Sequence, residues 1–167
     1  MLPLPMLFIV RIDRLSARIN MSMPAGAIRI AGKLQARLYR LSAGRLGGKS
    51  ARKPVLVLTT TGRRSGQPRS TVVLYKADGD NIVVIGSNAG NERAPAWGLN
   101  LEANPEAEVQ IRNERRRVRA RVAEGEERAQ LWTRMSSDYR GYDDYRARTN
   151  RDIKVFVLEP RPAASTH

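Results

Sequence analysis

The spacing of apolar residues changes along the chain and divides it into two kinds of element. Between Ala27 and Leu41, the apolar residues Ile30, Leu34 and Leu38 recur at helical intervals while lysine and arginine occupy the other faces. This pattern predicts a basic amphipathic helix. Packing of this helix on the rest of the chain or on a neighbouring subunit is favoured over a membrane surface, and both interpretations stay open.

Beyond this helix, short runs of β-branched residues and leucine dominate. The first, Pro54 to Thr60, is apolar at nearly every position, as in a strand buried on both faces. "RSTVVLY", "NIVVIGS" and "IKVFVLEP" predict further strands, and "ADGDN" supplies the Asp-Gly chemistry of a hairpin. Short helices are expected in "APAWGLNLEANP", "EGEERAQLWTRM" and the segment that holds three tyrosines. Antiparallel strands joined by short helices predict a mainly β, α+β fold that closes as a small barrel.

The basic run "NERRRVRARV" has two interpretations, a strand of a hairpin and a nucleic-acid-binding arm. A hairpin that turns at Asn113 and Glu114 pairs apolar residues on one face and opposite charges on the other. The expected pairs are Val109 with Val118, Ala107 with Ala120, Glu108 with Arg119 and Glu106 with Arg121. Because a binding arm would not need this matched alternation, the solvated strand face is favoured.

Composition limits the chemistry that the chain can perform. Lys and Arg number 30 and Asp and Glu 16, so the net charge is +14, which predicts an anionic partner: nucleic acid, an acidic membrane surface or a polyanionic cofactor. Cysteine is absent and the single histidine is the last residue, His167. Disulfides, thiolate nucleophiles, histidine triads and Cys or His metal sites are therefore excluded, and a reducing, cytoplasmic compartment fits. If the protein is an enzyme, a bound cofactor would carry the difficult chemistry.

One turn offers a place for an anion. In "TGRRSGQPR", Gly62 and Gly66 permit tight backbone geometry with free amides, and Arg63, Arg64 and Arg69 add guanidinium groups. Backbone amides and forked arginines both suit phosphate oxygens. These residues alone fit a phosphate site and a solvated turn equally well. The turn is not a Walker loop, because the GxxxxGK[ST] spacing is missing.

Five segments in a fixed order carry a resemblance to a known family. They are "LTTTGRRSGQPRSTVVLY", "VVIGSNAG", "PAWGLNLEANPEAEVQI", "RVAEGEERAQLW" and "YDDYRARTNRDIKVFVLEP". Together they resemble the deazaflavin-dependent nitroreductase and quinone reductase family of mycobacterial and actinobacterial oxidoreductases, over Pro54 to Pro160. The resemblance implies a split β-barrel and coenzyme F420, an 8-hydroxy-5-deazaflavin with a phosphodiester and an oligoglutamate tail. The implied reaction is hydride transfer from reduced coenzyme F420 to a quinone or nitroaromatic acceptor.

The resemblance also implies which residues form the site. The arginine turn would hold the cofactor phosphate, the strand after it would line the same groove, and two later segments and a tyrosine would surround the ring. The expected cofactor-binding residues are Arg63, Arg64, Ser65, Arg69, Ser70, Thr71, Val72, Val73, Leu74, Ile85, Gly86, Ser87, Asn88, Ala96, Trp97, Gly98, Leu99, Asn100 and Tyr142. The expected catalytic residues, which would contact the acceptor, are Ser87, Tyr139, Tyr142 and Tyr145.

The tyrosines and two departures from the family pattern concern the acceptor. Spaced at i, i+3 and i+6, the tyrosines would share one broad helix face and present an aromatic wall; half-buried packing is the alternative. Asn88 stands where the family often has lysine, and Gly98 follows Trp97 where an aromatic residue is frequent. We expect Gly98 to enlarge the pocket or loosen its wall, while the phosphate turn stays intact.

The chain is therefore expected to form one main domain with extensions. These are an uncertain N-terminal extension over 1–26, the basic helix and linker over 27–53, the split-barrel deazaflavin-binding domain over 54–160 and a tail over 161–167. The expected partner is a small-molecule acceptor and no specific nucleic acid, with a homodimer and peripheral membrane contact left open. Two alternatives remain, an FMN-binding split-barrel oxidoreductase and a non-enzymatic basic module that binds nucleic acid or membrane.

Overall fold

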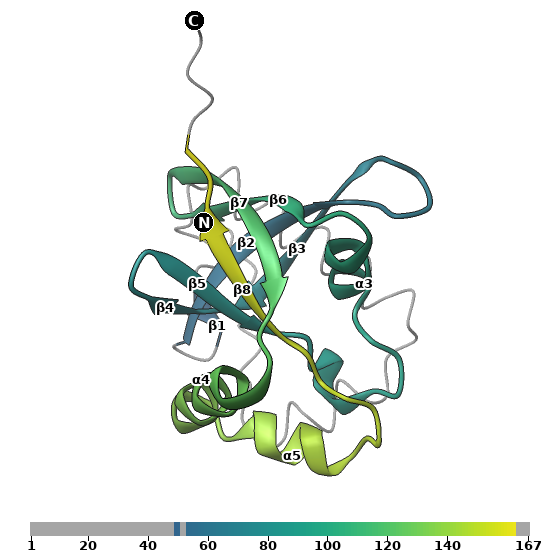
Figure 1. Ribbon diagram of the computed structural model, residues 1–167, viewed down its shortest axis with the longest axis vertical. Helices are drawn as coiled ribbons and strands as arrows, with labels where there is room; N and C mark the ends of the chain where they lie inside the picture. The colour runs from purple at the N-terminus through teal and green to yellow at the C-terminus, as the bar shows by residue number, and fades with distance from the viewer. Residues whose placement is uncertain (1–48, 51–52, 163–167) are drawn as a thin grey trace, which may run out of the picture.

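The computed structural model describes residues 49–50 and 53–162 of the 167-residue chain. The expected N-terminal extension, the amphipathic helix and most of the tail lie outside the described residues. Figure 1 shows the described elements. In chain order they are β1 (Lys49–Ser50), β2 (Lys53–Thr61), β3 (Pro68–Leu74), β4 (Lys76–Asp78), β5 (Asn81–Ile85), the 3-10 helix η1 (Asn88–Gly90), α3 (Ala96–Ala103), β6 (Glu106–Ile111), β7 (Glu114–Val122), α4 (Gly125–Asp138), α5 (Gly141–Ala147) and β8 (Val155–Pro160).

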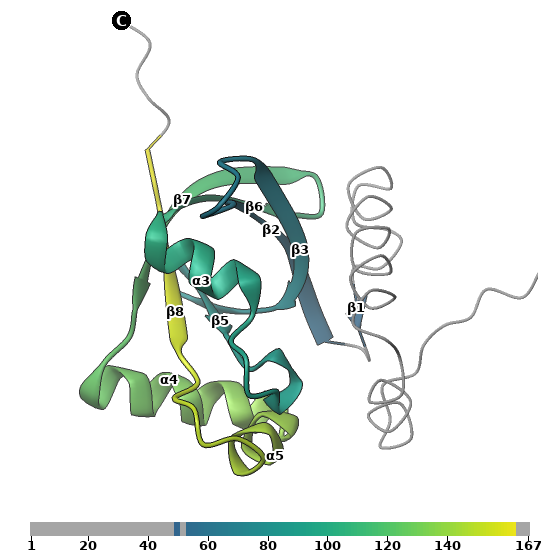
Figure 2. The same ribbon diagram turned by 90° about the vertical axis from the view of Figure 1, so that its right-hand side faces the viewer.

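The described strands form one antiparallel sheet that curls on itself. Its order is β1-β2-β6-β7-β8-β5-β4, and β3 pairs with the other side of β2. Only Tyr75 separates β3 from β4, so one bent stretch pairs first with β2, at Leu74 and Val55, and then with β5, at Lys76 and Val83. Through this bend the sheet returns toward its own edge (Figures 1 and 2), which confirms the mainly β, split-barrel expectation. The expected single strand "RSTVVLY" is thus interrupted at its last residue.

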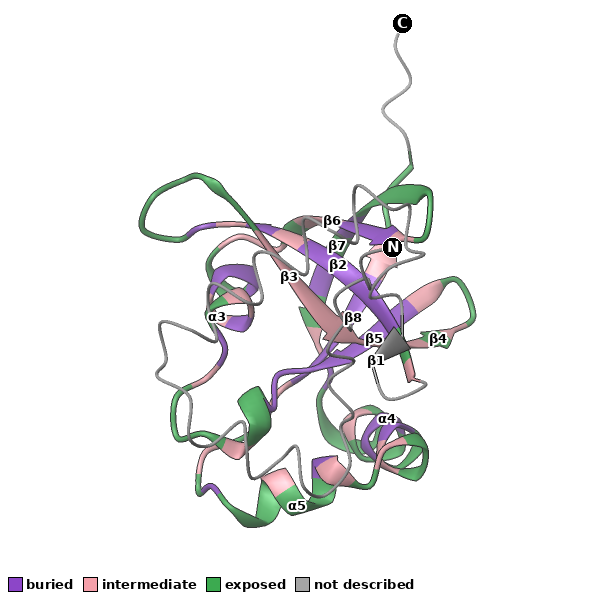
Figure 3. Cartoon of the chain, turned by 180° about the vertical axis from the view of Figure 1, so that it is seen from behind, coloured by how far each residue is buried: buried purple, intermediate pink, exposed green. Residues whose placement is uncertain are grey.

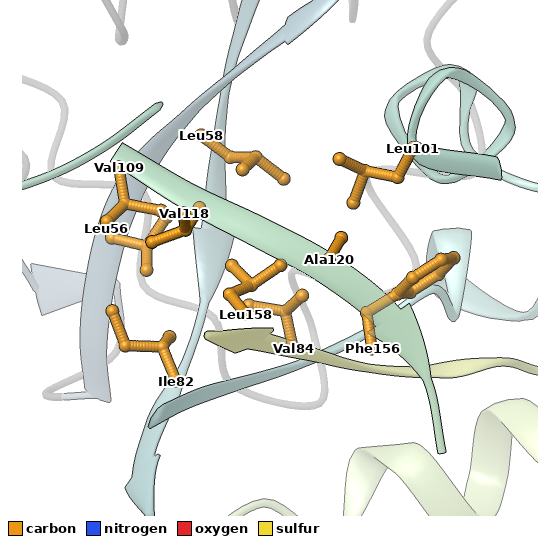
Figure 4. Close-up of a cluster of buried hydrophobic side chains, with 10 residues drawn as sticks. All are labelled: Leu56, Leu58, Ile82, Val84, Leu101, Val109, Val118, Ala120, Phe156 and Leu158. Carbon is orange, nitrogen blue, oxygen red and sulfur yellow. The ribbon is translucent and has the colours of Figure 1, made fainter. Parts of the chain in front are cut away.

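Two cores form on opposite faces of β5 and β8. In β8, all four residues from Val155 to Leu158 are buried, because alternate side chains enter different cores. One core fills the barrel, as Figure 4 shows, with Leu56, Leu58, Ile82, Val84, Leu101, Val109, Val118, Ala120, Phe156 and Leu158. The other lies between the sheet and helices α4 and α5 and includes Val83, Ile85, Leu131, Trp132, Met135, Tyr142, Val155 and Val157. The helices therefore cover the outer face of β5 and β8.

The β6–β7 hairpin is present, but its expected register is wrong by two residues. The turn falls at Arg112 and Asn113, with φ of +54° at Arg112. The observed pairs include Glu106 with Arg119, Ala107 with Val118 and Glu108 with Arg117. Because side chains alternate with a period of two, a shift of two residues leaves every side chain on its expected face. The face with the acidic and basic residues therefore remains outside the barrel.

Helix α3 is bounded by two prolines. Pro95 precedes its first turn, and Asn104, which precedes Pro105, is extended with φ of −145°. This boundary confirms the expected end of the helix, since a residue before proline disfavours the α conformation. α3 lies beside the end of the barrel from which the β2–β3 turn projects (Figure 1), so it is placed next to the arginine turn.

Candidate functional site

The β2–β3 turn keeps its shape through bonds among its own residues. The Gly62 amide donates to the Gln67 carbonyl at 2.9 Å, and the Ser65 and Gly66 amides donate to the Gly62 carbonyl at 3.1 and 2.7 Å. Gly66 has φ of +65°, a conformation that favours glycine. A Cβ on Gly62 would lie 2.7 Å from Ser65 Oγ and 3.1 Å from the Gln67 carbonyl oxygen. Both glycines are therefore required by the shape of this turn.

Most amides of the turn are not free, which differs from the expectation. The Gln67 amide donates to Ser65 Oγ at 3.3 Å, and the Arg63 amide donates to Asn100 Oδ1 at 3.1 Å. Among residues 62–67, only the Arg64 amide has no acceptor in the described part of the chain. An anion at this turn must consequently be bound mainly by side chains.

The three arginine side chains of the turn are available for that role. Arg63, Arg64 and Arg69 are exposed, as the green tip of the hairpin in Figure 3 shows, and within the described residues none of them forms an ion pair with a carboxylate. Arg69 Nη2 donates to Ser65 Oγ at 3.2 Å, which holds that guanidinium over the turn. Three unneutralised guanidinium groups at one turn are well suited to phosphate oxygens.

Asn100 connects this turn to α3. Its side chain is only 4% exposed. Oδ1 accepts from the Arg63 amide, and Nδ2 donates to Thr60 Oγ1 at 3.0 Å. Asn100 was expected beside the cofactor ring, but its carboxamide is directed at the turn.

The strand after the turn presents two faces. Ser70 Oγ lies 2.9 Å from Thr59 Oγ1 on one face, and Val72 and Leu74 follow on that same face. Thr71 and Val73 alternate to the other face, where Val73 packs against the barrel core. The five side chains from Ser70 to Leu74 therefore cannot line one groove together.

The loop after β5 is the second expected contact region. Ile85, Gly86 and Ser87 are buried, and Asn88 is exposed. The loop turns through consecutive left-handed residues, with φ of 46° at Asn88, 54° at Ala89 and 77° at Gly90. Left-handed backbone is costly at Asn88 and Ala89, so surrounding groups must hold it.

Arg151, which sequence reasoning missed, holds this loop. Its Nη2 donates to the carbonyls of Gly86 and Ser87 at 2.9 and 2.6 Å, and its Nε donates to the Asn91 carbonyl at 2.8 Å. Partial burial lowers the pKa of the Arg151 guanidinium, although the negative charges of Glu92 and Asp152 act to raise it. Its position in the sequence, between a short helix and a strand, did not indicate this role. Every residue has a backbone carbonyl, so the sequence does not show which carbonyls an arginine will contact.

The α3 residues near the loop pack against neighbouring side chains. The Trp97 and Phe156 ring centroids are 5.4 Å apart. A Cβ on Gly98 would lie 3.4 Å from Pro95 Cγ and 3.5 Å from the Phe156 ring, an ordinary contact. Pro95 and Phe156 border Gly98 closely enough that a Cβ would only touch them, and the expectation that Gly98 enlarges the pocket or loosens its wall stays a prediction. Ala96 is exposed and Leu99 is half-buried on the same helix.

The tyrosines form a packed cluster rather than one helix face. Tyr139 ends α4, while Tyr142 and Tyr145 lie on α5. Tyr142 is 4% exposed and meets Tyr139 edge-on at 5.2 Å, and burial raises its pKa above the usual value. Tyr142 thus has the packing role that was the alternative. Tyr139 and Tyr145 are half-buried, with their hydroxyl oxygens 2.8 Å apart.

The expected site segments follow one another along one side of the molecule (Figure 2). Asn100 joins the turn to α3, Pro95 at the start of α3 lies against Gly86, and Gly90 lies against the Tyr145 backbone on α5. We call this series, the β2–β3 turn, α3, the 85–91 loop and α5, the site rim. A cavity of about 490 Å³ lies elsewhere, at the β6–β7 turn, and none of the expected site residues lines it.

Two absences apply to residues 53–162. No group of three or more His, Cys, Asp or Glu side chains there is arranged to hold a metal ion. No helix in that part of the chain combines the length and apolarity needed to cross a membrane.

A split barrel with an exposed arginine turn at one end and a helix beside it is similar to the fold of a solved F420-H2 dependent reductase. Residues 31–160 match the sequence model of the family described as F420H(2)-dependent quinone reductase, and the chain belongs to this family. Its members are oxidoreductases that use reduced coenzyme F420, which confirms the expected enzyme class and cofactor. The FMN alternative receives no support.

The similar proteins agree with this assignment. Rv3178 of Mycobacterium tuberculosis, which bears the same family name, is 40% identical over 116 residues, spanning 68% of this chain and 98% of that protein. A solved F420-H2 dependent reductase, FDR-A, is 33% identical with a TM-score of 0.59, covering 64% of this chain and 94% of that chain. A structure described as a domain-swapped dimer is 29% identical with a TM-score of 0.61, covering 82% and 100%.

Proposed function

We propose that this protein binds coenzyme F420 along the site rim, with the cofactor phosphate at the β2–β3 turn and the ring beside α3 and the 85–91 loop. The bound reduced cofactor supplies a hydride to a quinone. The protein residues bind and orient the two reactants, which suits a chain without an internal histidine.

The residues of the turn fit a phosphodiester. The observation that carries the proposal is that Arg63, Arg64 and Arg69 are exposed, form no ion pair with a carboxylate in the described part of the chain, and stand on a turn whose backbone is fixed. Charge-assisted hydrogen bonds from guanidinium to phosphate oxygen are among the stronger ones in proteins. The net charge of +14 also attracts a cofactor that carries several glutamates.

At the other end of the rim, hydroxyl groups would orient the acceptor. Ser87 is 8% exposed, and its hydroxyl makes no hydrogen bond within the described residues, so it can donate to the ring or to an acceptor oxygen. The Tyr139 and Tyr145 hydroxyls bond each other, which leaves one proton of the pair to donate outward. Tyr142 supports them by packing.

Finer assignments are also part of the proposal. Nitroaromatic compounds share the planar shape of quinones and would use the same surface. A homodimer is supported by the similarity to a domain-swapped dimer. Peripheral membrane contact through residues 27–41 and a cytoplasmic location rest on the sequence alone.

A fluorescence titration tests the cofactor proposal. Purified protein is titrated with coenzyme F420 and, in parallel, with FMN at two salt concentrations, and oxidation of reduced coenzyme F420 is then followed with menadione and with a nitroaromatic compound. We expect saturable binding of coenzyme F420 alone, weaker at the higher salt, and turnover with menadione. Binding of FMN, or of neither compound, would overturn the proposal.

A further inference from the structure

Asn100 lies where the phosphate part and the ring part of the site rim meet. We propose that Asn100 is a positioning residue that fixes the arginine turn relative to α3, and so sets the separation between phosphate and ring. The inference rests on the proposed function and deepens it, because it gives a role to a buried residue that does not face the cofactor.

Both hydrogen bonds of the Asn100 side chain are directed toward the β2–β3 hairpin. Oδ1 accepts from the Arg63 amide at 3.1 Å, and Nδ2 donates to Thr60 Oγ1 at 3.0 Å. A backbone N–H needs an acceptor, so the carboxamide can have only this orientation. Since the residue is 4% exposed, its polar atoms have little surface to offer a ligand. Asn100 therefore acts through the turn.

The turn is oriented by its two strands and by one contact with another element. The β2–β3 pairing continues up to Thr61 and Pro68, so the strands set the general direction of the turn. The bonds among Gly62, Ser65, Gly66 and Gln67 all lie inside the turn and hold its shape. The bond from the Arg63 amide to Asn100 reaches another element, and it starts from the first residue of the arginine pair.

α3 is itself held firmly, so it can serve as the reference for the turn. Leu101, the next residue, is 3% exposed in the barrel core, and Trp97 packs against Phe156. Removal of the Asn100 carboxamide leaves the Arg63 amide without its acceptor and Thr60 Oγ1 without its donor, and polar groups that lose a partner carry a free-energy cost. Removal of Asn100 should therefore release the turn while α3 stays in place.

The test separates phosphate-dependent binding from general loss of structure. Asn100→Leu removes both hydrogen bonds of the carboxamide at similar size. Thr60→Val keeps the bond from the Arg63 amide and removes two bonds of the Thr60 hydroxyl, the one from Asn100 and the 3.4 Å bond to the Arg69 carbonyl. Asn104→Ala is the matched control, because Asn104 also accepts from a backbone amide, that of Glu106 at 3.1 Å, at the other end of α3. Affinity is measured by fluorescence for coenzyme F420 and for the same deazaflavin without phosphodiester and glutamates, together with the melting temperature.

We expect Asn100→Leu to weaken coenzyme F420 on the order of 10-fold, as for the loss of one charge-assisted phosphate contact, and to change the phosphate-free deazaflavin less than about 2-fold. Thr60→Val should show the same selectivity with a smaller loss, and Asn104→Ala should change neither affinity. In an Arg63→Ala, Arg64→Ala, Arg69→Ala background, adding Asn100→Leu should change coenzyme F420 affinity little, because the effect passes through those arginines.

The outcomes distinguish the inference from the proposed function. If the unmodified protein does not bind coenzyme F420, the proposed function fails. If it binds and the arginine variant binds more weakly, but Asn100→Leu weakens both ligands equally or neither, the positioning role is overturned. Should Asn100→Leu fail to fold, Thr60→Val decides: a loss confined to coenzyme F420 supports the role, and its absence overturns it.

Discussion

Two arginine-rich hairpins of this molecule differ in how their arginines are paired with carboxylates. On β7, Arg116 pairs with Glu114, Arg119 with Glu106, and Arg121 with Glu127 and Glu159, at 2.6 to 2.7 Å. The β2–β3 turn holds three exposed arginines with no carboxylate partner among the described residues. Arg115 and Arg117 on β7 are also exposed and form no ion pair among the described residues, so missing partners alone do not distinguish the two hairpins.

The two hairpins also differ in the length of their turns and in the contacts that hold the turn backbone. The β6–β7 hairpin continues its strand pairing up to a two-residue turn, from Ile111 to Glu114. The β2–β3 turn is longer, depends on Gly62 and Gly66, and is tied to α3 by Asn100. A fixed backbone below unpaired charges is what an anion site requires, since orientation of donors then costs less on binding.

The largest expected effect comes from replacing arginines with alanine, in one hairpin at a time. Arg63→Ala with Arg69→Ala should weaken coenzyme F420 binding on the order of 100-fold, because two charge-assisted contacts are lost. Arg119→Ala with Arg121→Ala, the matched control, should leave the affinity within about 2-fold and lower the melting temperature instead. Fluorescence titration and thermal unfolding measure both. Equal affinity losses in the two variants would remove the distinction between the hairpins.

The next largest expected effect comes from replacing Arg151, and it tests whether the 85–91 loop contacts the ring or the phosphate of the cofactor. Arg151→Met removes three hydrogen bonds to the carbonyls of Gly86, Ser87 and Asn91. We expect affinity for coenzyme F420 and for the phosphate-free deazaflavin to fall together, on the order of 10-fold, because the loop that would contact the ring loses its support. Lys154→Met, which removes a surface ion pair with Glu102, is the control. A loss confined to coenzyme F420 would contradict the assignment of the loop to the ring.

A smaller effect distinguishes two buried glycines. Gly62→Ala places a Cβ 2.7 Å from Ser65 Oγ and should distort the turn, with coenzyme F420 affinity falling about 3-fold to 10-fold. Gly98→Ala makes only ordinary contacts and should change neither affinity nor stability by more than about 0.5 kcal/mol. Titration and thermal unfolding of both variants test this difference. Normal affinity in Gly62→Ala would mean that the shape of the turn is not needed for binding.

Much of the fold could be predicted from the sequence, since it depends on local patterns. Apolar runs located the main strands, and Pro105 marked the end of α3. The hairpin faces were right although the register was wrong, because the period-two pattern fixes the face and not the pair. The position of the turn at Arg112, a residue in the left-handed region, was not indicated by its residue type.

The site was less predictable, because its geometry depends on contacts between distant segments. The arginine turn is visible in the sequence, but Asn100 reaches the Arg63 amide across 37 positions, and Arg151 reaches Gly86 across 65. Tyr142 has the spacing of an exposed helix face, yet α5 packs on Trp132 and buries it. A sequence shows which groups are present, and the packing decides which of them remain accessible.

The smallest expected effect concerns pH and the two carboxylates paired with arginines of β7, Glu106 on β6 and Glu127 on α4. Hydrogen bonds from Arg119 and Arg121 lower the pKa values of Glu106 and Glu127 below 4.5. A carboxylate with a lowered folded-state pKa contributes stability that is present above its unfolded pKa and is lost as the pH falls through the folded value. The melting temperature should therefore decrease below about pH 4.5 in the unmodified protein, and less so in a Glu106→Gln, Glu127→Gln variant, with the difference kept small by solvent exposure. Because no acidic group among residues 53–162 pairs with Arg63, Arg64 or Arg69, substituting these arginines with alanine should leave that pH profile unchanged. A profile altered by the turn substitutions would show that the two hairpins share their charge interactions.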